Sequence, residues 1–199
     1  MSLRERKAEL TRRRIVDEAM RRFVADGYEQ TTLESIAAAV DLSTVTIYRY
    51  FGSKEMIILE GFQEKYGPYL STLREQPAEA DVPTVLSRAI QARLTMTAED
   101  RESVLMARNV IDEAPAARAR LWDILAEHRS ATTEVIAERS GSAPDDMAVQ
   151  LAARIAVLIA ETASDRFRAD PDGAEPQDIA RDLMRVLRDG KVLLPDPDA

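Results

Sequence analysis

Apolar residues recur at helical spacing along most of the chain, and no long stretch alternates between apolar and polar residues as a strand would. Proline and glycine are few, with 9 and 7 residues among 199. The pattern therefore predicts an all-α protein. About nine helices are expected, at roughly residues 9–26, 33–40, 44–51, 54–66, 83–97, 98–112, 115–140, 147–163 and 176–190. A charged arm is expected at residues 1–8 and an irregular tail at 192–199.

The segment from Thr31 to Lys54 predicts two short helices joined by a tight turn, with a third helix beginning directly afterwards. Either Thr31 or Thr32 can cap the first helix, and Glu34 has capping-box spacing from Thr31. Asp41 is expected at the turn, because Asp tolerates a non-helical backbone better than most residues. The stripe expected to be buried consists of Leu33, Ile36, Ala37 and Val40.

The second helix of the pair is expected to begin after Ser43, a natural N-cap, and to end at Gly52. Ile47 and Phe51 face inward, four residues apart. The residues left outward are Thr44, Thr46, Tyr48 and Arg49. This layout is typical of a helix-turn-helix, whose outward face supplies hydrogen-bonding groups for base edges and phosphates. An ordinary pair of surface helices in an all-α protein gives the same spacing.

Several short runs in this segment resemble a known family. They are Ile36-Ala37, Val40-Asp41-Leu42-Ser43, Thr46-Ile47-Tyr48, Tyr50-Phe51 and Ser53-Lys54-Glu55. Together they resemble the N-terminal domain of the TetR (tetracycline-repressor-like) family of bacterial transcription regulators. The resemblance covers about the first quarter of the chain. Two positions depart from the family pattern, since Asp41 stands where Gly is usual and Val45 where a small residue or Pro is usual.

The resemblance implies DNA-binding roles for nine residues. Phosphate contacts are implied for Tyr48, Tyr50 and Lys54, assisted by Thr32 and Ser43. Contacts to bases in the major groove are implied for Thr44, Val45, Thr46 and Arg49. Arg49 is the best candidate for a bidentate contact to guanine, and Val45 for a contact to a thymine methyl group.

The distribution of charge agrees with a DNA-binding head, although the net charge is −8. Residues 1–54 contain ten Lys or Arg against eight Asp or Glu, whereas the remainder contains 17 against 27. A mildly basic head on an acidic body presents one end to DNA. A chance fluctuation of surface charge would give the same split, so it supports the motif without standing alone.

Composition also bounds the chemistry. The chain has no Cys and one His, which excludes disulfides and thiolate zinc sites and argues against any metal site. We find no paired acid and base, nucleophile elbow or Gly-rich phosphate loop, so we expect neither an enzyme nor a cofactor. The charged N-terminus lacks the apolar core of a secretory signal, and we expect a cytoplasmic protein.

The helix expected at residues 147–163 is apolar nearly all round, so we expect it to be buried on more than one side. It is too short and too interrupted by polar residues for a convincing membrane span. It is either the central helix of a monomeric bundle or a helix shared with a second copy. The family resemblance favours the second alternative, because members dimerise through their last two helices, here residues 147–163 and 176–190.

The sequence says less about an effector. The helices of the body should enclose an apolar pocket, and the candidate polar or aromatic contacts are Arg108, Asn109, Trp122, Arg154 and Glu161. Trp122 is a candidate pocket wall, although a single Trp is more often part of the core. His128 is expected to be a partly exposed helix residue. The run from Met106 to Leu121 weakly resembles the family branch that binds acyl-CoA-like effectors.

The sequence thus predicts a helix-turn-helix domain at residues 1–54, a connecting helix at 54–66 that carries the ligand signal, and a ligand-binding and dimerisation domain at 67–191. The expected function is a ligand-responsive regulator, most simply a repressor. It would bind a palindromic operator as a homodimer and be released by a small, largely apolar effector. The alternative is a helical protein-interaction module with a vestigial helix-turn-helix.

Overall fold

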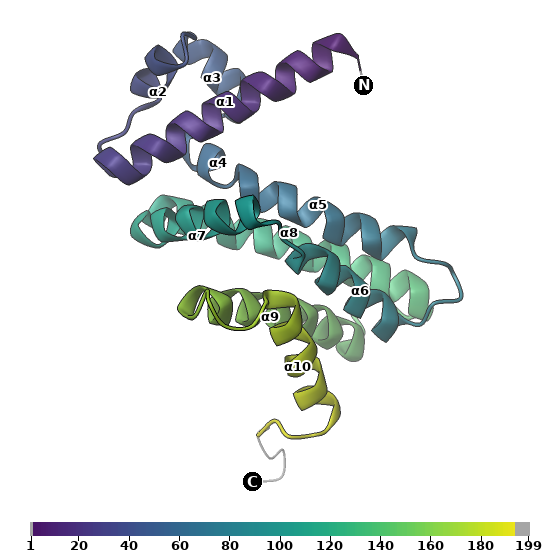
Figure 1. Cartoon of the computed structure of the whole chain (residues 1–199). Coiled ribbons are helices and arrows are strands. Elements are labelled where there is room, and N and C mark those ends of the chain that lie inside the picture. Colours follow the sequence, from purple (N-terminus) through teal and green to yellow (C-terminus); the bar gives the residue numbers. More distant parts are fainter. Residues whose placement is uncertain (1, 194–199) are drawn as a thin grey trace. The chain divides into compact units, whose positions relative to one another are not determined.

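A computed structural model describes residues 2–193, without the side chains of residues 61–66, 98–100 and 103. Every regular element in this part of the chain is a helix, which confirms the predicted all-α class. Ten helices are present there, one more than predicted (Figure 1). They are α1 (Leu3–Asp26), α2 (Leu33–Ala39), α3 (Thr44–Phe51), α4 (Lys54–Ile58), α5 (Glu60–Glu75), α6 (Val82–Leu94), α7 (Ala98–Glu113), α8 (Pro115–Ser140), α9 (Met147–Ala169) and α10 (Pro176–Arg188).

The helices form two compact units. The first contains the chain up to Glu64 together with Met96–Leu125. The second contains Lys65–Thr95 and the chain from Ala126 onward. The helices α5 and α8 each begin in the first unit and end in the second.

In the first unit α1 is the helix on which several other helices pack. It packs against α2 and α4, and α7 packs against α1 and α4 (Figure 1). Its buried residues are Ile15, Ala19 and Phe23. The predicted start of the first helix at residue 9 is wrong, because α1 already begins at Leu3, within the charged arm. The cause is a capping box, in which Ser2 and Glu5 satisfy each other's backbone N–H groups.

The connecting helix also differs from the prediction. Instead of one helix that ends at Gly67-Pro68, the chain breaks at Leu59, and α5 then continues through Pro68 to Glu75. Proline inside a helix removes a backbone hydrogen bond and costs about 3 kcal/mol. Beyond it, however, Tyr69 and Leu73 are fully buried, and their burial outweighs that cost.

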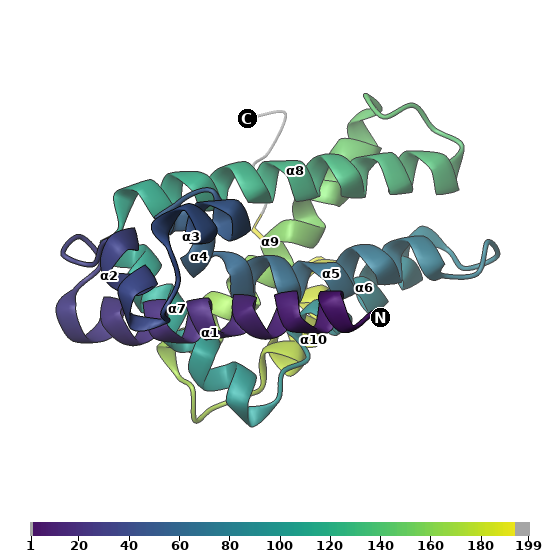
Figure 2. The same cartoon turned by 90° about the horizontal axis from the view of Figure 1, so that it is seen from above.

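In the second unit α6, α9 and α10 pack against one another. Part of the core lies between α8 and α9, where Ile136 and Ala137 meet Val149 and Ala153. Figure 2 shows the connection between α8 and α9. At the start of this connection Gly141 has a φ of 66°. Only Gly adopts this conformation without strain, which explains why α8 ends just before this residue.

The helix α9 begins at Met147 as predicted but continues to Ala169. One of its faces is buried by α6 and α10, whereas Met147, Leu151 and Leu158 are exposed. In this chain it is therefore not buried all round. Within the described residues, α9 is the helix that is long and apolar enough to cross a membrane, and core helices of soluble proteins meet the same criterion.

Candidate nucleic-acid interface

The turn between α2 and α3 is built by local capping. Thr32, not Thr31, is the N-cap of α2, and it exchanges hydrogen bonds with Ser35 at 3.1 and 3.2 Å. The predicted pairing of Thr31 with Glu34 is absent, because Thr31 is buried and its hydroxyl donates to the Gly27 carbonyl oxygen at 2.9 Å. Asp41 has a φ of 54°, which confirms the predicted non-helical turn.

The helix α3 presents a polar outward face. Ser43 caps it by accepting a hydrogen bond from the Thr46 amide at 3.1 Å. The apolar Ile47 and Phe51 are buried, as predicted. On the other side Val45 is 78% exposed, and Arg49 lies in solvent. Base edges lie inside a groove, so only such protruding side chains can reach them.

All nine predicted DNA-binding residues belong to the first unit. Five are exposed, namely Thr32, Ser43, Val45, Tyr48 and Arg49. Four are partly buried, namely Thr44, Thr46, Tyr50 and Lys54. The Arg49 guanidinium lies 5.9 Å from the centre of the Tyr50 ring. Val45, Tyr48 and Arg49 are thus the exposed side chains of α3 itself. The contacts of these residues with DNA stay a prediction.

Arg12 joins three elements of this unit, which the sequence did not reveal. From α1 it donates to the Tyr50 carbonyl oxygen at the end of α3, at 3.1 Å, and stacks 4.6 Å from the centre of the Phe51 ring. It also forms a two-pronged ion pair with Glu60, the first residue of α5, which is buried. We call this group the Arg12 clasp. It fixes the end of α3 relative to the start of α5.

The neighbouring arginines have different roles. Arg14 donates to the Val40 carbonyl oxygen at 3.0 Å and so satisfies the end of α2. Arg13 is exposed and pairs with Glu9 one turn away. Arg13 is therefore a solvated surface residue. Arg12 and Arg14 instead brace the helix-turn-helix.

Lys54 lies at the start of α4 and binds the connection between α1 and α2. Its Nζ donates to the carbonyl oxygens of Tyr28 and Thr31, at 2.7 and 3.1 Å, and lies 4.1 Å from the centre of the Tyr28 ring. An ammonium has three donor hydrogens, so one is left for another acceptor. Lys54 therefore has a structural role in addition to the phosphate contact that the sequence predicts.

A second link in the same place joins Tyr28 and Glu55. The Tyr28 hydroxyl donates to the Glu55 carboxylate at 2.9 Å. Burial raises the pKa of Tyr28, and the adjacent carboxylate raises it further. Burial would raise the pKa of Glu55 as well, but hydrogen bonds from its own amide, Ser53 and Tyr28, with the charge of Lys54, lower it overall. The carboxylate is therefore ionised and the phenol neutral at neutral pH, as this hydrogen bond requires.

The five predicted effector contacts are divided between the two units. Arg108, Asn109 and Trp122 belong to the first unit, and Arg154 and Glu161 to the second. Trp122 is 63% exposed, so the expectation that it belongs to the core is wrong. Arg154 lines a groove described below. These five roles stay predictions.

His128 is partly buried, as predicted. Its pKa is lowered from 6.5 to about 4, first by burial and then by the charge of Arg93. Nearby in the second unit, the Tyr69 and Thr132 hydroxyls share a buried hydrogen bond of 3.0 Å. In the described part of the chain no three His, Asp or Glu side chains gather as metal ligands would.

Comparison with known proteins places the chain in a family. Residues 15–60 match the model for bacterial regulatory proteins of the tetR family, and residues 80–191 match the model for the MftR C-terminal domain. The second match spans more than half of the chain. The two matches cover separate parts of the chain, and the predicted domain boundaries stay a prediction.

Two characterised relatives are similar in sequence. One is the HTH-type transcriptional regulator TcmR from Streptomyces glaucescens, 31% identical over 150 residues. That match covers 72% of this chain and 66% of the relative, just under two thirds of its length. The other is a fatty acid metabolism regulator protein from Bacillus subtilis (strain 168), 25% identical over 142 residues, with 69% and 73% of the two chains covered.

The fold is shared with solved structures. The transcriptional regulator FadR from Bacillus subtilis, crystallised in complex with stearoyl-CoA, has a TM-score of 0.61 and 21% identity. The alignment covers 87% of this chain and 96% of that one. At this identity the likeness establishes the fold alone. Together with the two family matches, it leads to the conclusion that this chain is a member of the tetR family of bacterial regulatory proteins.

Proposed function

We propose that this protein is a transcriptional repressor that binds a palindromic operator as a homodimer and leaves it when a small, largely apolar effector binds the body. It would act in the cytoplasm, where bacterial DNA lies. The observation that carries the proposal is the outward face of α3, held in place by the Ser43 cap and the Arg12 clasp. A vestigial helix-turn-helix would have no need of so firmly fixed a polar face.

The DNA contacts proposed for each residue of this face follow from how far its side chain protrudes and from the groups it carries. Val45 and Arg49 would enter the major groove, with a methyl contact to thymine and a bidentate contact to guanine. Thr44 and Thr46 lie beside them on the same helix. Tyr48, Tyr50 and Lys54 would bind phosphates, and Thr32 and Ser43 would assist at the two helix N-termini.

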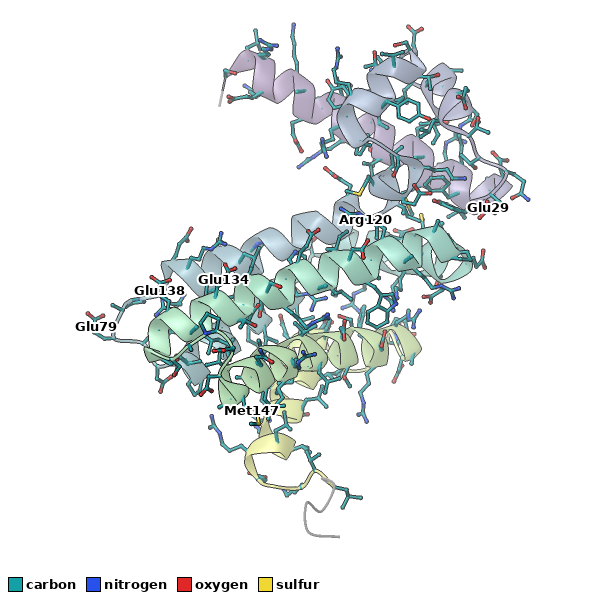
Figure 3. The ribbon with its side chains drawn as sticks, turned by 180° about the vertical axis from the view of Figure 1, so that it is seen from behind. Glu29, Glu79, Arg120, Glu134, Glu138 and Met147 are labelled. Carbon is teal, nitrogen blue, oxygen red and sulfur yellow. The ribbon has the colours of Figure 1, made fainter. Side chains whose placement is uncertain are left out.

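The dimer would form through α9 and α10. Leu151 and Leu158 of α9 are 57% and 58% exposed. Met147, at the start of the same helix, is more exposed still; its position is labelled in Figure 3. Val186 and Leu187 are also exposed on α10. Several exposed apolar residues on two neighbouring helices of one unit favour a partner surface. A two-fold partner would also supply the second half-site reader, which specific recognition by a short helix requires.

The effector is proposed from chemistry and kinship. The relative from Bacillus subtilis is named for fatty acid metabolism. The FadR structure that shares the fold of this chain was crystallised with stearoyl-CoA. We propose an acyl-CoA-like effector, which joins an apolar chain to an anionic head. By moving α4 and α5, it would change the spacing of the two heads. A tenfold loss of operator affinity needs about 1.4 kcal/mol of differential binding.

The test is selection of bound DNA from a random pool with the full chain, repeated with stearoyl-CoA present. An enriched palindrome that is depleted when stearoyl-CoA is added is expected. The matched control is the Val45→Ala/Arg49→Ala protein, which should enrich no such sequence. If the wild-type protein enriches nothing either, the repressor proposal is wrong, and the interaction-module alternative takes its place.

A further inference from the structure

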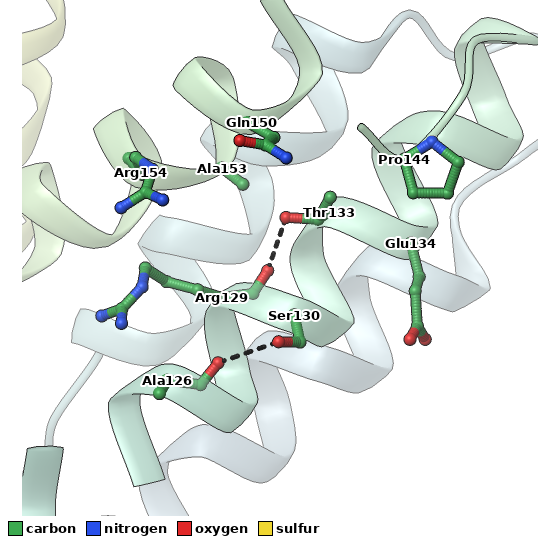
Figure 4. A pocket seen from close by; sticks show the side chains of 9 residues that line it. All are labelled: Ala126, Arg129, Ser130, Thr133, Glu134, Pro144, Gln150, Ala153 and Arg154. Carbon is green, nitrogen blue, oxygen red and sulfur yellow. Dashed lines mark hydrogen bonds between the residues drawn. The ribbon is translucent and has the colours of Figure 1, made fainter. Parts of the chain in front are cut away.

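A groove of about 400 Å³ lies between α8 and α9 in the second unit. Its walls are formed by Arg129, Ser130 and Thr133 from α8 and by Gln150 and Arg154 from α9 (Figure 4). This volume is at the lower end of the range for small-molecule sites. The groove is therefore large enough for part of an organic molecule and too polar to be a gap in the core.

The groove brings together two arginines that have no carboxylate partner among the described residues. Figure 4 shows the guanidinium groups of Arg129 and Arg154 on the same side of the groove, one from each wall. Neither forms an ion pair with a carboxylate of the described part of the chain. Elsewhere in the same unit Arg181 and Arg185 each pair with an Asp at 2.6 Å. Two like charges on one groove attract an anion more strongly than either does singly.

Two other polar groups of the groove, the Ser130 and Thr133 hydroxyls, are not free to donate hydrogen bonds to a ligand. The Ser130 hydroxyl donates to the Ala126 carbonyl oxygen at 3.2 Å, and the Thr133 hydroxyl to the Arg129 carbonyl oxygen at 2.9 Å (Figure 4). Their hydrogens are thus already in use. The donors left for a ligand are the two guanidinium groups and the Gln150 amide. Glu134 also lines the groove, but Figure 4 shows its carboxylate turned away from the two arginines.

We infer that this groove binds the phosphate-bearing head of an organic anion. A phosphate ester or diphosphate carries about two negative charges and matches two guanidinium groups, whereas one carboxylate would neutralise only one. The surrounding body is acidic, with Glu134 and Glu138 exposed along α8 (Figure 3), so the arginine pair is a local exception. The inference rests on the proposed function, because the effector would then be a phosphorylated amphiphile whose head lies here.

The position of the groove also suits regulation. Arg154 follows Leu151 by three residues and precedes Leu158 by four, so it borders the apolar face proposed for the second copy. A bound phosphate group would hold α8 and α9 together at the edge of that face. Effector binding would in this way change the proposed dimer surface of α9, and with it the spacing of the two helix-turn-helix domains.

The direct test is calorimetric titration of the full chain with coenzyme A, with pyrophosphate, and with pantetheine, the phosphate-free part of coenzyme A. We expect both phosphate compounds to bind the wild-type protein and pantetheine to bind at least tenfold more weakly. In Arg129→Gln and Arg154→Gln, affinity for coenzyme A should fall about tenfold or more, as expected for the loss of a charged hydrogen bond. Arg166→Gln, an exposed arginine of α9 outside the groove, is the matched control and should bind as the wild type does.

The inference is wrong if neither phosphate compound binds the wild-type protein, if pantetheine binds as well as coenzyme A, or if Arg166→Gln loses as much affinity as the groove variants. Melting temperature and oligomeric state are measured for each variant and should match the wild type. The calorimetry needs no DNA, so failure of the operator selection would refute the proposed function without touching this result. Conversely, a selected palindrome together with unaltered coenzyme A binding by both groove variants would refute the groove alone.

Discussion

Arg49 and Lys54 differ in what their side chains already contact. Arg49 protrudes into solvent, while Lys54 binds two backbone carbonyl oxygens of its own unit. The loss of Arg49 should therefore affect DNA recognition alone. Lys54 has a second contribution, because its removal leaves the connection between α1 and α2 without its donor.

We predict that Arg49→Ala relaxes specificity at one base pair and weakens operator binding by roughly 1–3 kcal/mol, without a change in melting temperature. Lys54→Met should weaken binding to all sequences, flatten its salt dependence and lower the melting temperature as well. Binding titrations at several salt concentrations and thermal unfolding measure these effects. Equal losses of affinity from both variants at every DNA site would show that the assigned roles are wrong.

Asp41 and Gly52 both have positive φ values, at 54° and 74°. A residue with a side chain is strained in this region by roughly 1–2 kcal/mol, and Asp less than most. Asp41→Gly should thus raise the free energy of unfolding by about 0.5 kcal/mol. Gly52→Ala should lower it by about 1 kcal/mol, and since a Cβ there meets nothing within 4 Å, the effect is purely one of backbone strain. Urea unfolding measures both, and a loss of stability in Asp41→Gly would contradict the strain argument.

His128 gives the protein a stability that depends on pH. Its folded pKa of about 4 lies below the ordinary value of 6.5, so between these values the unfolded chain holds a proton that the folded chain does not. This contribution is fully present above pH 6.5 and is lost as the pH falls towards 4. In His128→Gln, the loss of stability between about pH 7 and pH 5 should be smaller than in the wild type. Urea midpoints at the two pH values decide this, and an unchanged difference would contradict the assignment.

At the level of elements, the sequence predicted helix caps and turns correctly where the residues involved are close together in the chain. Ser43 and Asp41 each stand within a few residues of the structure they determine, and both were placed correctly from the sequence. The Arg12 clasp was not predictable, because Arg12 and Glu60 are separated by 48 residues and meet only in the folded unit. The path of α5 through Pro68 was missed for the same kind of reason. Buried residues beyond the proline, not the proline itself, decide where that helix ends.

The Arg12 clasp leads to a prediction at this scale. Arg12→Met removes the partner of a buried carboxylate and two charged hydrogen bonds, and should lower the free energy of unfolding by about 2 kcal/mol or more. Operator affinity should fall because the end of α3 is no longer fixed. Its salt dependence should keep the same slope, because the Arg12 guanidinium is already engaged by Glu60 and the Tyr50 carbonyl oxygen.

The double variant Arg12→Met/Glu60→Gln provides the control for this prediction. Removing the unpaired carboxylate should restore part of the lost stability, as a double-mutant cycle would reveal. Arg13→Met, which breaks only an exposed pair, should change stability by less than about 0.5 kcal/mol. A reduced salt slope in Arg12→Met would instead place Arg12 on the DNA backbone.

At the level of the whole molecule, the exposed face of α9 is the feature that a single chain does not explain. The apolar pattern of this helix was visible in the sequence, but the pattern is the same whether its second side meets its own domain or another copy. The structure removes the first alternative for Leu151 and Leu158, since both are exposed while the opposite side of α9 is packed on α6 and α10. Leucines left in water on a helix of this length favour association.

We predict that Leu151→Glu/Leu158→Glu converts the protein from a dimer to a monomer, because a second copy would have to bury four carboxylates in an apolar contact. Sedimentation velocity measures the change, and Val24→Glu, at an exposed apolar position of α1, is the control that should stay dimeric. The monomer should keep its helical content, since neither leucine is part of the core of the chain. Its operator affinity should fall by more than tenfold, because a single head contacts half of a palindrome and gains nothing from the other half. A monomeric wild-type protein would show that the proposed dimer is wrong, whereas a dimer that survives both substitutions would show that the heads are paired by another surface.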